Sequence, residues 1–157
     1  VADEPTTALD VSIQAQIISL LKNVCKKRGA AVMLITHDMG VIAETCDRVA
    51  VMYAGRIAEI GPVHQVINHP EHPYTVGLMA SIPDMDVDRE RLNQIDGAMP
   101  RLNAIPKGCA FNPRCPQVFD RCLQERPDLA AVSRSGQNTP TQVACWLHHA
   151  NTLEGVS

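Results

Sequence analysis

The chain has 157 residues, of which 45% are hydrophobic and 20% charged, and its formal net charge is −3. This composition is typical of a folded globular protein, and the charge does not indicate a nucleic-acid binder. No apolar run reaches the roughly 18 residues of a membrane-spanning helix, and the acidic first residues do not look like a signal peptide. Any membrane connection is therefore expected to come through a partner protein.

The first ten residues read Val-Ala-Asp-Glu-Pro-Thr-Thr-Ala-Leu-Asp. They predict the end of a buried strand, then the adjacent carboxylates of Asp3 and Glu4, a polar turn, and a helix N-cap at Asp10. Neighbouring carboxylates repel one another and raise each other's pKa. Mg²⁺ with substrate phosphates is a common partner that relieves this repulsion. A solvated acidic turn is the alternative interpretation of the acid pair.

A helix and a strand are expected next. Apolar residues recur at helical spacing from Val11 to about Lys27, and Gly29 is placed to end the helix. Residues 30–36 then form a continuous apolar run, which suits a parallel strand buried on both faces. A strand–helix–strand order predicts an α/β fold.

His37 directly follows this strand, and Asp38 can cap a short helix that ends near Thr45. Ligands gather at the carboxyl ends of strands in open α/β sheets, so His37 is a candidate catalytic or phosphate-sensing residue. For an isolated histidine, a hydrogen bond to a loop is the simpler interpretation.

The middle of the chain predicts a hairpin followed by two helices. The strands cover 48–53 and 56–60, a turn lies at Ala54–Gly55, and the helices cover 63–68 and a segment that ends near Ser81. Three histidines in this region invite a metal interpretation, but their spacing does not place them on one helix face. They are interpreted as surface or packing residues: His64, His69 and His72.

Residues 82–106 lose this periodicity and predict a linker across the surface. Three aspartates there resemble the start of a calcium loop. That interpretation is rejected because Arg89 stands where the loop requires glycine. The last residues, 150–157, are expected to form a loose tail.

Four of the six cysteines lie in the C-terminal third with the spacing C-x5-C-x6-C-x22-C: Cys109, Cys115, Cys122 and Cys145. A cytosolic chain does not maintain disulfides, so a metal site and four unrelated thiols are the alternatives. Four thiolates can hold Zn²⁺ or a [4Fe–4S] cluster, but this spacing matches neither zinc ribbons nor bacterial ferredoxins. Spacing alone leaves both alternatives open. A terminal strand over 142–147 is expected, anchored by Trp146.

Two of these segments resemble motifs of ATP-binding-cassette (ABC) ATPases. The first ten residues resemble the Walker B segment and D-loop, and Thr36-His37-Asp38 resembles the H-loop. The resemblance implies that Asp3 helps to hold Mg²⁺ through water and that Glu4 polarises the water that attacks the γ-phosphate of ATP. It also implies that His37 contacts the γ-phosphate and helps to hold the attacking geometry with Glu4. By the same resemblance, Asp10 closes a loop that reaches a partner subunit. These roles agree with phosphoryl transfer by positioning and charge stabilisation.

Two further segments resemble a narrower group, the ATPases of oligopeptide, dipeptide and nickel importers. The string His72-Pro-Tyr-Thr75 resembles a segment that follows their catalytic core, and the cysteine region resembles their C-terminal extension. Members of this group carry a [4Fe–4S] cluster on four such cysteines. The resemblance therefore implies a cluster on Cys109, Cys115, Cys122 and Cys145, with Zn²⁺ as second choice and free thiols as third.

The resemblance implies an α/β fold that is the C-terminal part of an ABC-type P-loop NTPase core, followed by a small Cys-rich C-terminal extension. The expected segments are an ATPase half-domain over 1–81, the linker over 82–106, the extension over 107–149 and the tail. The chain contains no phosphate loop of the form G-x-x-x-x-G-K-[ST] and no ABC signature segment. Both are expected upstream, so the polypeptide alone is expected to lack ATPase activity.

The implied function is that of an ATP-hydrolysing subunit of a bacterial ABC importer for dipeptides or oligopeptides. The implied partners are a second ABC ATPase subunit, two membrane permeases and, indirectly, a peptide-binding protein, with no nucleic acid. The implied location is the cytoplasmic face of the cell membrane. The sequence does not distinguish dipeptide, oligopeptide and nickel as substrates. The competing hypothesis is a free-standing metal- or iron–sulfur-binding interaction module whose ATPase motifs are silent.

Overall fold

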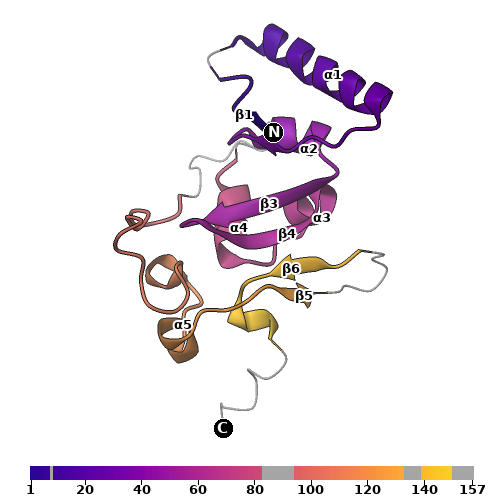
Figure 1. Cartoon of the computed structure of the whole chain (residues 1–157). Helices are drawn as coiled ribbons and strands as arrows, with labels where there is room; N and C mark the ends of the chain where they lie inside the picture. The colour runs from indigo at the N-terminus through magenta and orange to yellow at the C-terminus, as the bar shows by residue number, and fades with distance from the viewer. Residues whose placement is uncertain (8, 83–93, 133–138, 150–157) are drawn as a thin grey trace. The chain divides into compact units, whose positions relative to one another are not determined.

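The computed structural model describes residues 1–7, 9–82, 94–132 and 139–149. The chain forms two compact units, Val1–Asp47 and Arg48–Ser157, and each is described by itself (Figure 1). Residues 83–93 of the predicted linker, which include the three aspartates, lie outside the described residues, and so does the predicted tail, 150–157.

The first unit contains the strand–helix–strand order that the sequence predicts. Its elements are β1 (Ala2–Asp3), α1 (Val11–Arg28), β2 (Leu34–Ile35) and α2 (Met39–Thr45). The two strands are parallel, with Ala2 opposite Leu34 and Asp3 opposite Ile35. Helix α1 is thus the crossover of a βαβ arrangement, as expected for a parallel pair.

The ends of both helices follow the predicted capping residues. The Asp10 carboxylate accepts a hydrogen bond from the Ile13 N–H at 3.0 Å, and Gly29 ends α1 with a φ of 61°. Asp38 caps α2 by accepting from the Val41 N–H at 3.1 Å. The same carboxylate accepts from the Gln14 amide at 2.8 Å, which ties α2 to α1.

The strand predicted over residues 30–36 is shorter and more exposed than expected. Only Leu34 and Ile35 pair with β1, and Ile35 is 47% exposed. The prediction of burial on both faces is wrong for the described part of this unit. The reason is that β1 supplies only two residues for pairing, and within the described residues this sheet contains no third strand.

The second unit is built on a four-stranded antiparallel sheet in the order β3-β4-β6-β5. Its strands are β3 (Arg48–Tyr53), β4 (Arg56–Pro62), β5 (Ala130–Val132) and β6 (Thr141–Val143). The predicted hairpin is confirmed, whereas the terminal strand is shorter than expected. It ends at Val143 and is followed by a 3-10 turn, Trp146–His148.

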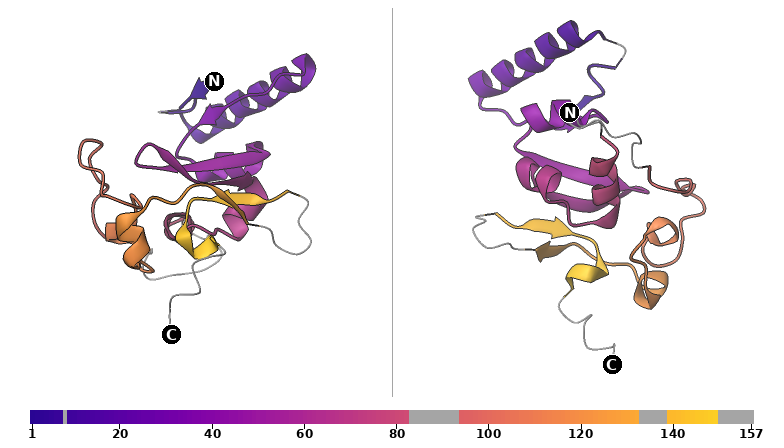
Figure 2. Two further views of the ribbon diagram at one scale, coloured as in Figure 1. Left: turned by 60° about the horizontal axis from the view of Figure 1, so that its bottom comes forward. Right: turned by 180° about the vertical axis from the view of Figure 1, so that it is seen from behind.

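Three α-helices accompany this sheet: α3 (Val63–Asn68), α4 (Pro73–Ala80) and α5 (Asp120–Gln124). The first two pack against the hairpin and are seen in front of it in the rear view of Figure 2. A 3-10 turn, Asn112–Arg114, and helix α5 lie in the cysteine region, together with β5. The sequence analysis predicted none of these three short elements.

The core of the second unit joins the hairpin to the cysteine region. Tyr53 packs against Phe111 with ring centroids 5.2 Å apart, and Tyr74 packs against both rings at 4.7 and 5.5 Å. Strand β4 also pairs with β6 at Glu59 and Ile60. The units therefore divide at residues 47 and 48, whereas the sequence analysis placed its first boundary at residue 81. The segments expected from the sequence, 1–81, 82–106 and 107–149, remain a prediction.

Candidate functional site

The two residues that the sequence analysis nominated for phosphate chemistry meet in the first unit. His37 Nδ1 lies 3.1 Å from Glu4 Oε1, although the residues are 33 positions apart in the chain. Parallel pairing of β1 and β2 produces this contact, because Glu4 and His37 both follow the carboxyl ends of their strands. The side chains of His37 and Glu4 are 82% and 47% exposed.

Glu4 is held by its neighbours in an unusual backbone conformation. Its φ is +41°, a region that residues other than glycine rarely adopt. Its N–H donates to the Ile35 carbonyl at 2.8 Å, and its carboxylate accepts from the Thr7 hydroxyl at 2.8 Å. The Thr7 hydrogen bond, followed by that to His37, holds the pKa of Glu4 below its usual value. Such a constrained carboxylate is typical of functional sites.

The other two acids of the opening segment differ in their surroundings. Asp3 lies at the last position of β1, opposite Ile35. Asp10 uses its carboxylate as the α1 N-cap. The predicted roles in Mg²⁺ binding for Asp3 and in a partner contact for Asp10 stay predictions. Thr7 and Gln14, which orient Glu4 and Asp38, were missed because no pattern in the sequence connects them to those acids.

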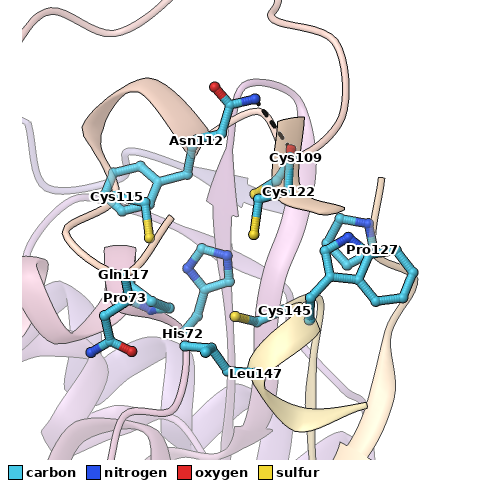
Figure 3. A pocket seen from close by; sticks show the side chains of 12 residues that line it. His72, Pro73, Cys109, Asn112, Cys115, Gln117, Cys122, Pro127, Cys145 and Leu147 are labelled. Atoms are coloured by element: carbon cyan, nitrogen blue, oxygen red, sulfur yellow. Dashed lines mark hydrogen bonds between the residues drawn. The ribbon is translucent and has the colours of Figure 1, made fainter. Parts of the chain in front are cut away.

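The four cysteines of the C-terminal third line a common pocket in the second unit (Figure 3). All six cysteines of the chain are free. The free space that this pocket encloses is only about 10 Å³, room for one water-sized group. In Figure 3 the sulfur atoms of Cys115, Cys122 and Cys145 point toward the space between them, and His72 lies beside them.

Backbone hydrogen bonds hold the cysteine loops together. The Cys109 N–H donates to the Cys122 carbonyl at 2.9 Å, and the buried Asn112 side chain donates to the carbonyls of Lys107 and Cys122 at 2.8 and 3.3 Å. Gly108 permits this close approach, because its φ is +75° and a Cβ there would lie 2.3 Å from the Cys122 oxygen. The predicted anchor is also present, since the Trp146 indole donates to the Glu125 carbonyl at 2.9 Å.

The pocket favours neutral thiols when nothing is bound to them. Burial raises the pKa of Cys109 and Cys115, and it raises that of Cys145 to about 12. The other three cysteines raise the pKa of Cys145 further, since neighbouring thiolates repel one another. Among the described residues, no group of three or more His, Cys, Asp or Glu side chains is arranged to hold a metal ion.

A buried acid, Glu59, fixes the His72–Thr75 segment beside this pocket. Glu59 is fully buried on β4, and it accepts hydrogen bonds from the N–H groups of Glu71 and His72 at 3.0 Å each. Burial raises the pKa of Glu59. The sequence analysis missed this residue, although an acid inside an otherwise apolar strand was a usable signal.

His72 connects the start of α4 to the strand that leads to Cys145. It is 3% exposed, its Nδ1 accepts from the Tyr74 N–H at 3.0 Å, and its ring bonds the backbone of Ala144. Of the three histidines interpreted as surface or packing residues, His72 is therefore a packing residue. His64 and His69 are exposed.

We expect the second unit to lose stability in acid because of His72. Burial lowers the pKa of His72 from 6.5 to about 4, so the unfolded chain takes up the proton first as the pH falls. The contribution is fully present above pH 6.5 and is lost toward pH 4. It amounts to about 3 kcal/mol.

Urea unfolding across this pH range measures the effect. The gap in unfolding free energy between wild type and His72→Gln should narrow as the pH falls, since glutamine does not titrate. The control is His69→Gln, a substitution of an exposed histidine. The difference in unfolding free energy between this variant and wild type should not change with pH. A gap for His72→Gln that is independent of pH would contradict a neutral, buried His72.

Known proteins of peptide transport resemble this chain over both of its units. A family model described as "Oligopeptide/dipeptide transporter, C-terminal region" matches residues 58–122, which include Glu59, His72 and three of the four cysteines. The oligopeptide transport ATP-binding protein AppD of Bacillus subtilis is 45% identical over 98% of this chain and 45% of its own length. The chain is thus similar, over nearly its whole length, to the ATP-binding proteins of peptide transport.

Two more relatives show the same similarity. The dipeptide transport ATP-binding proteins DppD of Bacillus subtilis and of Escherichia coli are 49% and 46% identical over 94% and 88% of this chain. The chain spans less than half the length of these relatives, 42% in both cases. Its mixed α/β fold is consistent with the C-terminal part of an ABC ATPase. Within the described residues, none of the helices has both the length and the apolar character needed to span a membrane.

Proposed function

We propose that this chain is part of an ATP-hydrolysing subunit that energises the import of dipeptides or oligopeptides. The observation that carries the proposal is the Glu4–His37 contact at 3.1 Å at the carboxyl ends of two parallel strands. Relatives named for peptide transport and ATP binding support it. The hypothesis of a free-standing metal-binding module has no such support, because these relatives match along both units.

In this proposal each residue of the first unit has a distinct task in hydrolysis. Glu4 stays ionised near neutral pH, since its hydrogen bonds lower its pKa, and its carboxylate orients and polarises the attacking water. His37 positions Glu4 and contacts the γ-phosphate. Asp3, at the end of β1, holds Mg²⁺ through water, and the ion supplies charge stabilisation when bound. The remaining phosphate contacts come from segments outside this chain.

The proposal includes the setting in which the subunit works. It pairs with a second ATPase subunit and docks on two membrane permeases at the cytoplasmic face of the membrane, and a peptide-binding protein delivers the substrate. Half-exposed apolar side chains of the first unit, such as Leu20, Met33 and Ile35, are surfaces that further parts of a longer subunit can cover.

Peptide uptake by living cells tests the proposed function. Cells that lack the full-length gene should lose uptake of a labelled dipeptide or tripeptide, and the wild-type gene should restore it. A gene carrying His37→Ala should restore little uptake, whereas His69→Ala, an exposed histidine of the second unit, should restore it fully. Normal uptake in the deletion strain, with no other peptide importer present, would refute the peptide assignment.

We further propose that residues 107–149 form a Cys-rich extension that holds a [4Fe–4S] cluster on Cys109, Cys115, Cys122 and Cys145. Support comes from the pocket that the four side chains share and from the raised pKa values of Cys109, Cys115 and Cys145, which a bound cation lowers. A single Zn²⁺ requires all four sulfurs at about 2.3 Å from one point. A four-iron cluster lets the four sulfurs lie further apart, and Zn²⁺ is the second choice.

Anaerobic purification followed by iron, sulfide and zinc analysis tests the cluster. The wild-type chain should contain about four iron and four sulfide per chain, and Cys115→Ser should lose most of both. Cys25→Ser, on α1 in the first unit, is the matched control and should keep the wild-type content. If the chain instead contains stoichiometric zinc, the site is a Zn²⁺ site and the cluster assignment is wrong. If it contains neither metal, the four cysteines are free thiols.

A further inference from the structure

A second cavity opens in the second unit, and no step of the proposed hydrolysis uses it. Its volume is about 300 Å³, at the lower end of the range for small-molecule sites. Three segments enclose it: the β3–β4 hairpin, the loop at Ala110 and Phe111, and residues 126–129, which precede β5.

The inner wall of this cavity is apolar and rigid. Tyr53 and Phe111 are 4% and 2% exposed, and their rings meet edge to face with an interplanar angle of 82°. Ile57, Ala110 and Leu129 extend the apolar lining. Because both rings are already almost fully covered, most of the apolar surface that a ligand could bury comes from Ile57, Ala110 and Leu129, of which Leu129 is 40% exposed.

The charged groups that line the cavity favour an anion. They belong to the exposed residues Arg56, Arg126 and Asp128. The lining therefore carries two positive charges and one negative charge. Within the described part of the chain, neither arginine side chain takes part in an ion pair or a hydrogen bond. His72 and Cys109 also line the cavity.

We propose that this cavity binds a small molecule with a flat apolar body and one anionic group. The apolar body packs against Ile57, Ala110 and Leu129, and the anionic group lies between Arg56 and Arg126. Arginine suits this contact because its planar guanidinium matches carboxylate and phosphate groups. The site stands apart from the proposed ATPase function and does not depend on it.

Cys109 gives this site an independent readout, because it lines both the second cavity and the cysteine pocket. A molecule bound against Ala110 covers the neighbouring thiol. In metal-free, reduced protein, alkylation of Cys109 should therefore slow when the cavity is occupied, whereas alkylation of Cys25 on α1 should not change.

A pair of probes that share an apolar body and differ in charge tests the proposal. By titration calorimetry, naphthoate should bind saturably and more tightly than the neutral naphthalenemethanol. Arg56→Gln and Arg126→Gln should each weaken naphthoate binding by about two- to fivefold, the size expected for an exposed ion pair. They should leave the affinity for the alcohol unchanged. Arg101→Gln, an exposed arginine outside the cavity, is the matched control.

Any of four results would overturn the proposal. One is the absence of saturable naphthoate binding, and another is equal affinity for both probes. The third is an arginine substitution that weakens both probes alike, since this would mean a loss of shape and not of charge. Binding that leaves the alkylation rate of Cys109 unchanged would place the probe elsewhere on the chain and would also overturn it.

Discussion

Replacement of Glu4 by glutamine is expected to reduce ATP hydrolysis by the full-length, assembled subunit by about 10²- to 10⁴-fold, the range for a positioned acid–base group. Glutamine keeps the size of the side chain and can still accept from the Thr7 hydroxyl. It lacks the negative charge that polarises water. Phosphate release at saturating Mg²⁺ and ATP measures the loss. Nucleotide affinity should change little, because the proposed role concerns the reacting water.

The matched control for this substitution is Glu44→Gln, an exposed acid on α2 in the same unit. Its rate should equal that of wild type. Replacement of His37 by alanine should also lower the rate, and its effect should be smaller in a Glu4→Gln background, since His37 acts partly through Glu4. If the Glu4→Gln enzyme hydrolyses ATP at a rate close to that of wild type, Glu4 has no role in the hydrolytic step.

The sequence predicted the elements whose ends carry local signals. Asp10 and Gly29 bound α1 as expected, and Ala54–Gly55 turns the hairpin. Such features depend on residues close together in the chain, so capping and turn chemistry identify them. The Glu4–His37 contact could also be predicted. The resemblance to two motifs of one family implied it, and a parallel βαβ arrangement produces it.

The sequence did not predict how the cysteine region joins the hairpin. Pairing of β4 with β6 and packing of Tyr53 against Phe111 link residues more than fifty positions apart, and no local pattern encodes such contacts. Strand β5 and helix α5 are too short for periodicity to be measured. The predicted boundary after residue 81 was based on a change in composition. In the structure the core continues across it, because Tyr74 packs against Phe111.

Gly108→Ala is expected to have the largest effect on stability, a loss of about 3 kcal/mol in the free energy of unfolding. This figure combines the cost of a positive φ with a Cβ and the cost of overpacking. The added Cβ would lie 2.3 Å from the Cys122 oxygen and 2.8 Å from the Leu123 carbonyl carbon. Both are backbone atoms of α5, so relief requires the helix to move away from the Cys109 loop.

Gly55→Ala separates the two contributions to that loss. Its φ of +77° nearly equals the +75° of Gly108, but a Cβ there meets no atom within 4 Å. It should therefore cost only about 1 kcal/mol, the backbone contribution alone. Urea unfolding of both variants measures the difference, and equal losses would mean that α5 does not press against Gly108. Because that contact sets the distance between Cys109 and Cys122, Gly108→Ala should also lower the iron content, whereas Gly55→Ala should not.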